Sequence, residues 1–139
     1  MSSLFFVHER LSQADGVVAI LDAACDAFET MLSVLRAHED PGDPLFGALM
    51  MAAASAADGR DAVLFAPSLP PHRLQAAGAE GGPDTVGSDA DVLAGLSELL
   101  AARLDDAGRI APGPGDRAAC QAAAQWARDI HGLLTRNVP

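Results

Sequence analysis

The sequence contains no tyrosine and no lysine, only one tryptophan and only five phenylalanines. Half of its residues are nevertheless hydrophobic, which excludes an intrinsically disordered chain. Much of that half is alanine, which favours helix strongly but contributes little buried area. We therefore expect closely packed helices around a core that rests on a few large side chains. A length of 139 residues suits a single helical domain over 1–139.

Because lysine is absent, all nine basic residues are arginine, and the formal net charge is −10. The arginines form no basic patch. Neutralisation of phosphates by basic side chains supplies most of the affinity for nucleic acid, so the charge argues against a nucleic-acid partner. An anionic membrane surface is disfavoured for the same reason. A basic protein or peptide remains open as a partner.

Cysteines and long apolar runs are also scarce. Cys25 and Cys120 make neither a disulfide framework nor a metal motif, and each lies on an apolar helical face, so we expect both to be reduced and buried. The apolar run nearest the N-terminus, Leu4 to Val7, is too short for a secretory signal, and no run reaches membrane-spanning length. The expected location is the cytoplasm, and no cofactor is expected.

The strongest pattern that is present is a helical one between residues 14 and 39. Ser12 and Asp15 resemble a capping box at its start, and Pro41 and Gly42 end it. A single broad apolar stripe runs along this segment, at alternating spacings of four and three residues: Val17, Leu21, Ala24, Phe28, Met31 and Leu35. So broad a stripe needs several neighbours, and it predicts a central helix with Phe28 in the core.

Three further segments have a helical period, at 43–66, 88–108 and 116–136, the last capped by Asp116. Together with 14–39 they predict an all-α fold, an antiparallel four-helix bundle. Residues 1–12 fit a short extra N-terminal helix, a short strand, or an arm docking on another subunit. For 61–66 a buried strand is the alternative to the favoured helix. The Pro/Gly/Ala-rich segment of about 67–87 is expected to be a mobile loop.

Few side chains suggest chemistry. The sequence has no nucleophile elbow, P-loop or dinucleotide-binding motif. A site between the helices would be lined by the large apolar residues Phe28, Met31, Met50 and Trp126. A metal site is not expected; the weak candidates for one are His38, Asp43 and His131.

The leading hypothesis for function is a non-enzymatic helical interaction or regulatory protein that acts as a homodimer, with Leu4 to Val7 contributing to the contact. The alternative is a small-molecule-binding bundle, either a sensor or an enzyme, with a pocket between its helices. The first requires an exposed apolar surface, whereas the second requires an enclosed cavity with convergent polar groups.

Overall fold

The computed structural model describes residues 3–38, 40–42, 44–69 and 86–137, and these residues form helices and no strands. The predicted all-α class is confirmed. There are five helices: α1 (Ser3–Gln13), α2 (Val17–Ala37), α3 (Phe46–Leu64), α4 (Val86–Ile110) and α5 (Pro114–Asn137). Residues 3–12, part of the segment for which the sequence allows a helix, a strand or an arm, are therefore helical. Within the described part of the chain, no helix is both long and apolar enough to cross a bilayer.

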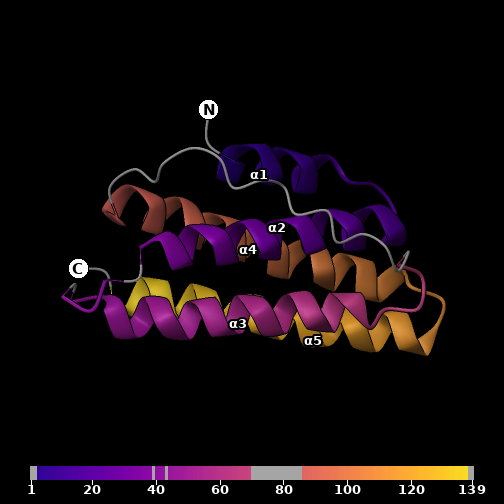
Figure 1. Cartoon of the computed structure of the whole chain (residues 1–139). Helices are drawn as coiled ribbons and strands as arrows, with labels where there is room; N and C mark the ends of the chain where they lie inside the picture. Colours follow the sequence, from indigo (N-terminus) through magenta and orange to yellow (C-terminus); the bar gives the residue numbers. More distant parts are fainter. Residues whose placement is uncertain (1–2, 39, 43, 70–85, 138–139) are drawn as a thin grey trace.

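Four of the helices contact one another in a closed order. Helix α2 packs against α3, α3 against α5, α5 against α4, and α4 against α2. Figure 1 shows that α2 and α3 run in opposite directions, as do α4 and α5. Helix α1 lies outside this group and packs on α2 and α4. The hydrophobic core therefore lies between α2, α3, α4 and α5, with a smaller extension under α1.

Helix α1 packs on α2 and α4 through one apolar face. Leu4, Val7 and Leu11 recur at helical spacing and are at most 2% exposed. The chain then reverses at Gly16, whose φ of 92° lies in the left-handed region that glycine adopts without a steric penalty. Helix α1 therefore folds back along α2 (Figure 1).

Two arginines tie α1 to its neighbours. Arg10 of α1 pairs with the buried carboxylate of Asp26 on α2. Arg103 of α4 donates from Nε to the carbonyl oxygen of Leu11 at 3.2 Å and from its guanidinium to that of Ala14. These carbonyls belong to the end of α1, where no intrahelical donor is left for them. A side chain 92 positions away in sequence thus caps the helix.

The start of α2 differs from the sequence prediction. Helix α2 begins at Val17 after Gly16, with no side-chain hydrogen bond at the cap. The Ser12 hydroxyl donates to the carbonyl oxygen of His8 within α1 instead. The capping box expected from Ser12 and Asp15 is therefore wrong, because Ser12 belongs to the preceding helix.

The other boundaries agree with the expectations to within a few residues. Helix α3 continues to Leu64, so the helix favoured for 61–66 is confirmed as far as that residue. Of the segment expected to be a mobile loop, Pro67–Leu69 forms a turn with Leu69 buried, and α4 begins at Val86. Residues 70–85, on which that expectation mostly falls, lie outside the described residues.

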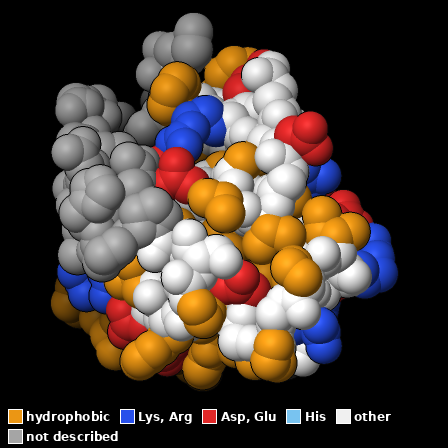
Figure 2. Space-filling view, turned by 90° about the vertical axis from the view of Figure 1, so that its right-hand side faces the viewer, with side chains coloured by type: hydrophobic (Ala, Val, Ile, Leu, Met, Phe, Trp, Pro, Cys, Tyr) orange, Lys and Arg blue, Asp and Glu red, His pale blue; other side chains and the backbone are white. Residues whose placement is uncertain are grey.

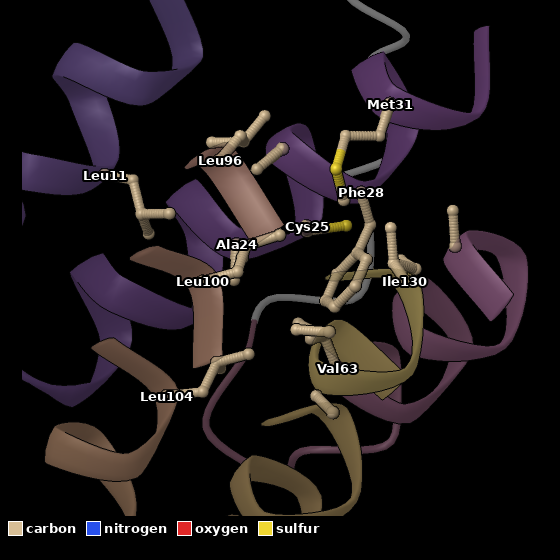
Figure 3. Packing of buried hydrophobic residues seen from close by; sticks show 14 of the residues in the cluster. Leu11, Ala24, Cys25, Phe28, Met31, Val63, Leu96, Leu100, Leu104 and Ile130 are labelled. Atoms are coloured by element: carbon tan, nitrogen blue, oxygen red, sulfur yellow. The ribbon is translucent and has the colours of Figure 1, made fainter. Parts of the chain in front are cut away.

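Phe28 is at the centre of the core, as the stripe predicts. Its side chain is completely buried, and Figure 3 shows it among aliphatic side chains from several helices, including Val63 of α3 and Ile130 of α5. The ring lies directly against Gly59 of α3: a Cβ atom placed there would come within 2.4 Å of the ring atom Cε1. The absence of a side chain at Gly59 thus allows α3 to approach α2 closely.

Candidate interaction surface

An open groove of about 490 Å³ lies between α3 and α5, near the C-terminal end of α3. Four alanines line it and are together called its floor: Ala62, Ala118, Ala119 and Ala122. Phe65 and Trp126 are the large side chains that line it. Figure 2 views the end of the molecule at which α3 stops and α4 turns into α5, where hydrophobic side chains lie at the surface among charged and polar ones.

Phe65 is the most exposed large hydrophobic side chain of the described residues, at 83%. Its backbone is nevertheless held in place. The Phe65 N–H donates to the carbonyl oxygens of Asp61 and Ala62, at 3.2 and 3.3 Å, and the Ala66 N–H donates to that of Val63 at 3.0 Å. Phe65 therefore sits on a hydrogen-bonded helix end, and its exposure does not result from fraying.

The turn that follows Phe65 is bound to the start of α5. The Asp116 carboxylate accepts hydrogen bonds from the Ser68 N–H, at 3.0 Å, and from the Ser68 hydroxyl. Pro67 packs against Gly115, where a Cβ would lie 2.8 Å from the proline Cγ. Asp116, expected from sequence to cap its own helix, thus joins α5 to the turn after α3. It holds the backbone that follows Phe65 in place at one end of the groove.

The charged side chains that line the groove are all acidic. Asp58 and Asp61 are exposed on α3, and no arginine lines the groove. Asp61 pairs with Arg60 at 3.2 Å, but Arg60 also binds Glu29 of α2 at 2.7 Å and so is drawn toward the neighbouring helix. Asp58 has no ion pair with any described residue. The groove thus combines an apolar floor with negative charge on the α3 side.

A second groove, of about 310 Å³, lies between α4 and α5. Both signs of charge and some apolar surface contribute to its lining: Leu104, Asp105, Gly108, Arg109, Arg117 and Gln121. Asp105 already pairs with Arg128 at 3.0 Å, and Arg117 donates to two backbone carbonyls of the α4–α5 turn. Its charged groups are thus largely engaged within the protein, and it lacks exposed aromatic side chains.

The four residues predicted to line a pocket between the helices differ in burial and do not line one common pocket. Phe28 and Met31 are completely buried in the core and lie close together (Figure 3). Met50 is 48% exposed on α3, and Trp126 is half-buried on α5. Of the four, Trp126 alone lines either of the two grooves described above.

Two of the three weak candidates for metal ligands are histidines near the ends of helices. His38 follows the end of α2, and His131 is half-buried near the end of α5. Because α2 and α5 run in the same direction, both histidines lie toward one end of the molecule (Figure 1). Asp43 lies outside the described residues. Across 3–38, 40–42, 44–69 and 86–137, no three His, Cys, Asp or Glu side chains form a metal-ligand group.

Cys25 and Cys120 are free and buried, as predicted. Burial raises the pKa of each thiol from 9.0 to about 11. For Cys25 the carboxylates of Asp26 and Glu29 add to this effect, because a negative charge nearby disfavours a thiolate. The thiolate is the reactive form, so neither cysteine is suited to nucleophilic or redox chemistry near neutral pH.

Neither cysteine is expected to react with a thiol reagent such as Ellman's reagent in the native protein at neutral pH, whereas both should react at once in denaturant.

The raised pKa values of the two thiols also predict that the protein loses stability at alkaline pH. The stabilising contribution is complete below the unfolded value near pH 9 and disappears as the pH rises through about 11. Since the chain has no lysine or tyrosine, thiols are the only side chains that ordinarily titrate in this window. Urea titrations at pH about 8 and about 10.5 should show this loss, and a Cys25→Ala/Cys120→Ala variant should show less of it. An equal loss in the variant would contradict the assignment.

Phe65 is a site residue that was not predicted from the sequence, where 61–66 was only a choice between helix and strand. The helical spacing nevertheless indicates its exposure. Val63 lies on the buried face of α3, and a residue two positions later points to nearly the opposite side. Pro67, close behind, marks the helix end and keeps Phe65 from continuing into another buried turn.

In comparisons with known proteins, no family model, no curated protein and no solved structure matches the chain.

Proposed function

We propose that the protein is a non-enzymatic helical interaction protein that acts as a homodimer. One observation carries this proposal: Phe5, Phe6 and Phe65, three of the five phenylalanines, are 53%, 57% and 83% exposed. The core is built largely of alanine and leucine, and burying a phenylalanine stabilises a fold by roughly 1.5–3 kcal/mol. Large side chains that are kept outside such a core are typical of a surface that another molecule covers.

The framework for this function is, in our proposal, an antiparallel four-helix bundle of α2, α3, α4 and α5 to which α1 is added. The closed order of contacts among the four helices supports it. Helix α1 then has two roles. Leu4 and Val7 attach it to its own bundle, whereas Phe5 and Phe6 point outward from the same helix.

The outward face of α1 is the proposed dimer contact. In a two-fold arrangement each copy contributes the same patch, so the two phenylalanines of one copy meet those of the other. The net charge of −10 on each copy opposes association, and salt screens that repulsion. The dimer should therefore strengthen as the salt concentration rises.

A small-molecule-binding bundle is the weaker proposal. It was based on a pocket between the helices, with Phe28 and Met31 among its lining residues. Both side chains are completely buried within the packed core, and neither lines a described groove. The exposed phenylalanines, by contrast, are already at the surface, where a protein partner reaches them.

Analytical ultracentrifugation tests the homodimer. The wild-type chain should sediment as a dimer at protein concentrations on the order of 50 μM, where a micromolar complex is populated. A Phe5→Ser/Phe6→Ser variant should sediment as a monomer with an unchanged circular dichroism spectrum, because the residues that attach α1 are intact.

Val92→Ser provides a control, since it removes another exposed apolar side chain, 40% exposed on α4, and should leave the dimer unchanged. A wild-type monomer at this concentration would remove the homodimer from the proposal. A dimer that persists in the double phenylalanine variant would place the contact elsewhere.

A further inference from the structure

From the groove between α3 and α5 we infer that the protein binds a basic amphipathic helix of another protein, with Phe65 and Trp126 as its apolar contacts and Asp58 and Asp61 as its charged ones. This inference rests on the proposed interaction function and names the class of partner. It uses a surface separate from the outward face of α1.

The shape of the groove favours a helix as the occupant. Four alanines line it, and their short side chains allow a helix to approach closely between the aromatic and acidic ones. Residues 58–65 of α3 extend along the groove for about 10 Å, which is close to two helical turns. A helix presents apolar side chains three and four residues apart, and such a pair matches two aromatic contacts. Addition of a strand to a sheet edge is excluded for the described residues, because they contain no strand.

The anchor is prepared in advance. Phe65 is held by backbone hydrogen bonds at the end of α3, and the turn behind it is bound to α5 by Asp116. The backbone around Phe65 therefore loses little conformational entropy when the groove is filled, which favours binding. An exposed phenylalanine on a flexible loop lacks this advantage.

The charge of the groove identifies the partner as basic. Asp58 and Asp61 are its only charged lining residues, and Asp58 has no ion pair among the described residues. The whole chain carries −10, so the long-range field also attracts cationic molecules. A second copy of this chain would bring the same aspartates and the same net charge to the contact. Nucleic acids and anionic membranes are repelled for the same reason.

The test uses a designed helical peptide of about 18 residues with leucine at positions i and i+4 on one face, lysine on both flanks and no aromatic residue. Trp126 is the only tryptophan and the chain has no tyrosine, so intrinsic fluorescence reports directly on the groove. Titration of the full-length protein should shift the Trp126 emission and give a dissociation constant on the order of 10 μM at low salt. A matched peptide with glutamate in place of lysine should not bind.

Variants of the protein separate the two kinds of contact. Phe65→Ser should weaken binding by about tenfold or more, since it removes an anchor. Ala122→Gln, which places a longer neutral side chain on the floor, should weaken it similarly while preserving the helix. Asp58→Asn/Asp61→Asn should weaken binding by about threefold to tenfold at low salt and reduce its salt dependence. Ile110→Ser, which removes a 62% exposed apolar side chain outside the groove, should have no effect.

Three outcomes would overturn the inference: equal binding of the glutamate peptide, absence of any change in Trp126 emission, or an equal loss in Ile110→Ser and Phe65→Ser. Ultracentrifugation of the same Phe65→Ser sample gives a fourth, because a dimer lost there would make a second copy the occupant. Peptide binding and self-association are read separately. A protein that dimerises but ignores the peptide contradicts this inference alone, and a monomer that binds the peptide contradicts the homodimer alone.

Discussion

Replacing Phe28 by alanine is expected to lower the free energy of unfolding by about 3–5 kcal/mol, the range for removing a completely buried aromatic ring. The loss should fall in the upper part of that range. The core around the ring is mostly alanine and aliphatic, and alanine side chains are too short to move into the cavity. Since small domains are stable by only about 5–15 kcal/mol, this single change removes a large share of the total.

Urea unfolding followed by circular dichroism measures the effect. Phe65→Ala is the matched control, because it is the same exchange at an 83% exposed position, and it should change the free energy of unfolding by no more than about 0.5 kcal/mol. A loss below about 1 kcal/mol for Phe28→Ala would contradict the position of the ring at the centre of the core.

Gly59→Ala is expected to destabilise the protein, although alanine is the better helix former. The added Cβ would lie 2.4–2.9 Å from three atoms of the Phe28 ring, and the buried ring has no free space to move into. Overpacking of this kind costs about 1–3 kcal/mol. At contacts this short the cost should fall in the upper part of that range, at about 2–3 kcal/mol. The gain in helix propensity offsets about 1 kcal/mol of it, which leaves a net loss of about 1–2 kcal/mol.

The sign of this effect should reverse when the ring is absent. In a Phe28→Ala background, Gly59→Ala should stabilise the protein by about 1 kcal/mol, since the clash is gone and the helix preference remains. Gly95→Ala in α4 is the control, because a Cβ there meets nothing within 4 Å, and it should be stabilising in both backgrounds. A Gly59→Ala variant that is as stable as wild type would show that α2 and α3 are not in such close contact.

The central helix could be predicted well from sequence because its pattern is local. The apolar residues of the predicted stripe from Leu21 to Leu35 are all completely buried in α2. Helical spacing places such residues on one face whatever the rest of the chain does, and the broad face predicted several neighbours. Residues 1–12 have a shorter pattern, so a helix was only one of three possibilities there, beside a strand and an arm.

The helix ends were predicted less well, because an isolated glycine or capping residue has a meaning that depends on its surroundings. The helix predicted for 88–108 continues past Gly108, since α4 ends at Ile110. A Cβ at Gly108 would lie 3.3 Å from the Cβ of Cys120, so the glycine permits close contact between α4 and α5. Ser12 and Asp116 likewise have caplike positions in sequence but bind other partners in the fold.

For the candidate site, the sequence placed Trp126 among the large apolar residues expected to line a pocket between the helices. The structure places it half-buried, beside a groove whose other wall is formed by α3. Phe65 was not recognised as its counterpart. The two residues are 61 positions apart in sequence and come together only because α3 and α5 pack side by side.

Composition and periodicity by themselves determined that the chain is helical, acidic and built around Phe28, since these follow from residue type and from spacing within one helix. The packing of α3 against both α2 and α5 depends on tertiary contacts: Gly59 under the Phe28 ring, and Asp116 binding Ser68. Which aromatic side chains stay in solvent depends on the same contacts. The groove is lined by side chains of α3 and α5, so its position depends on how these two helices pack.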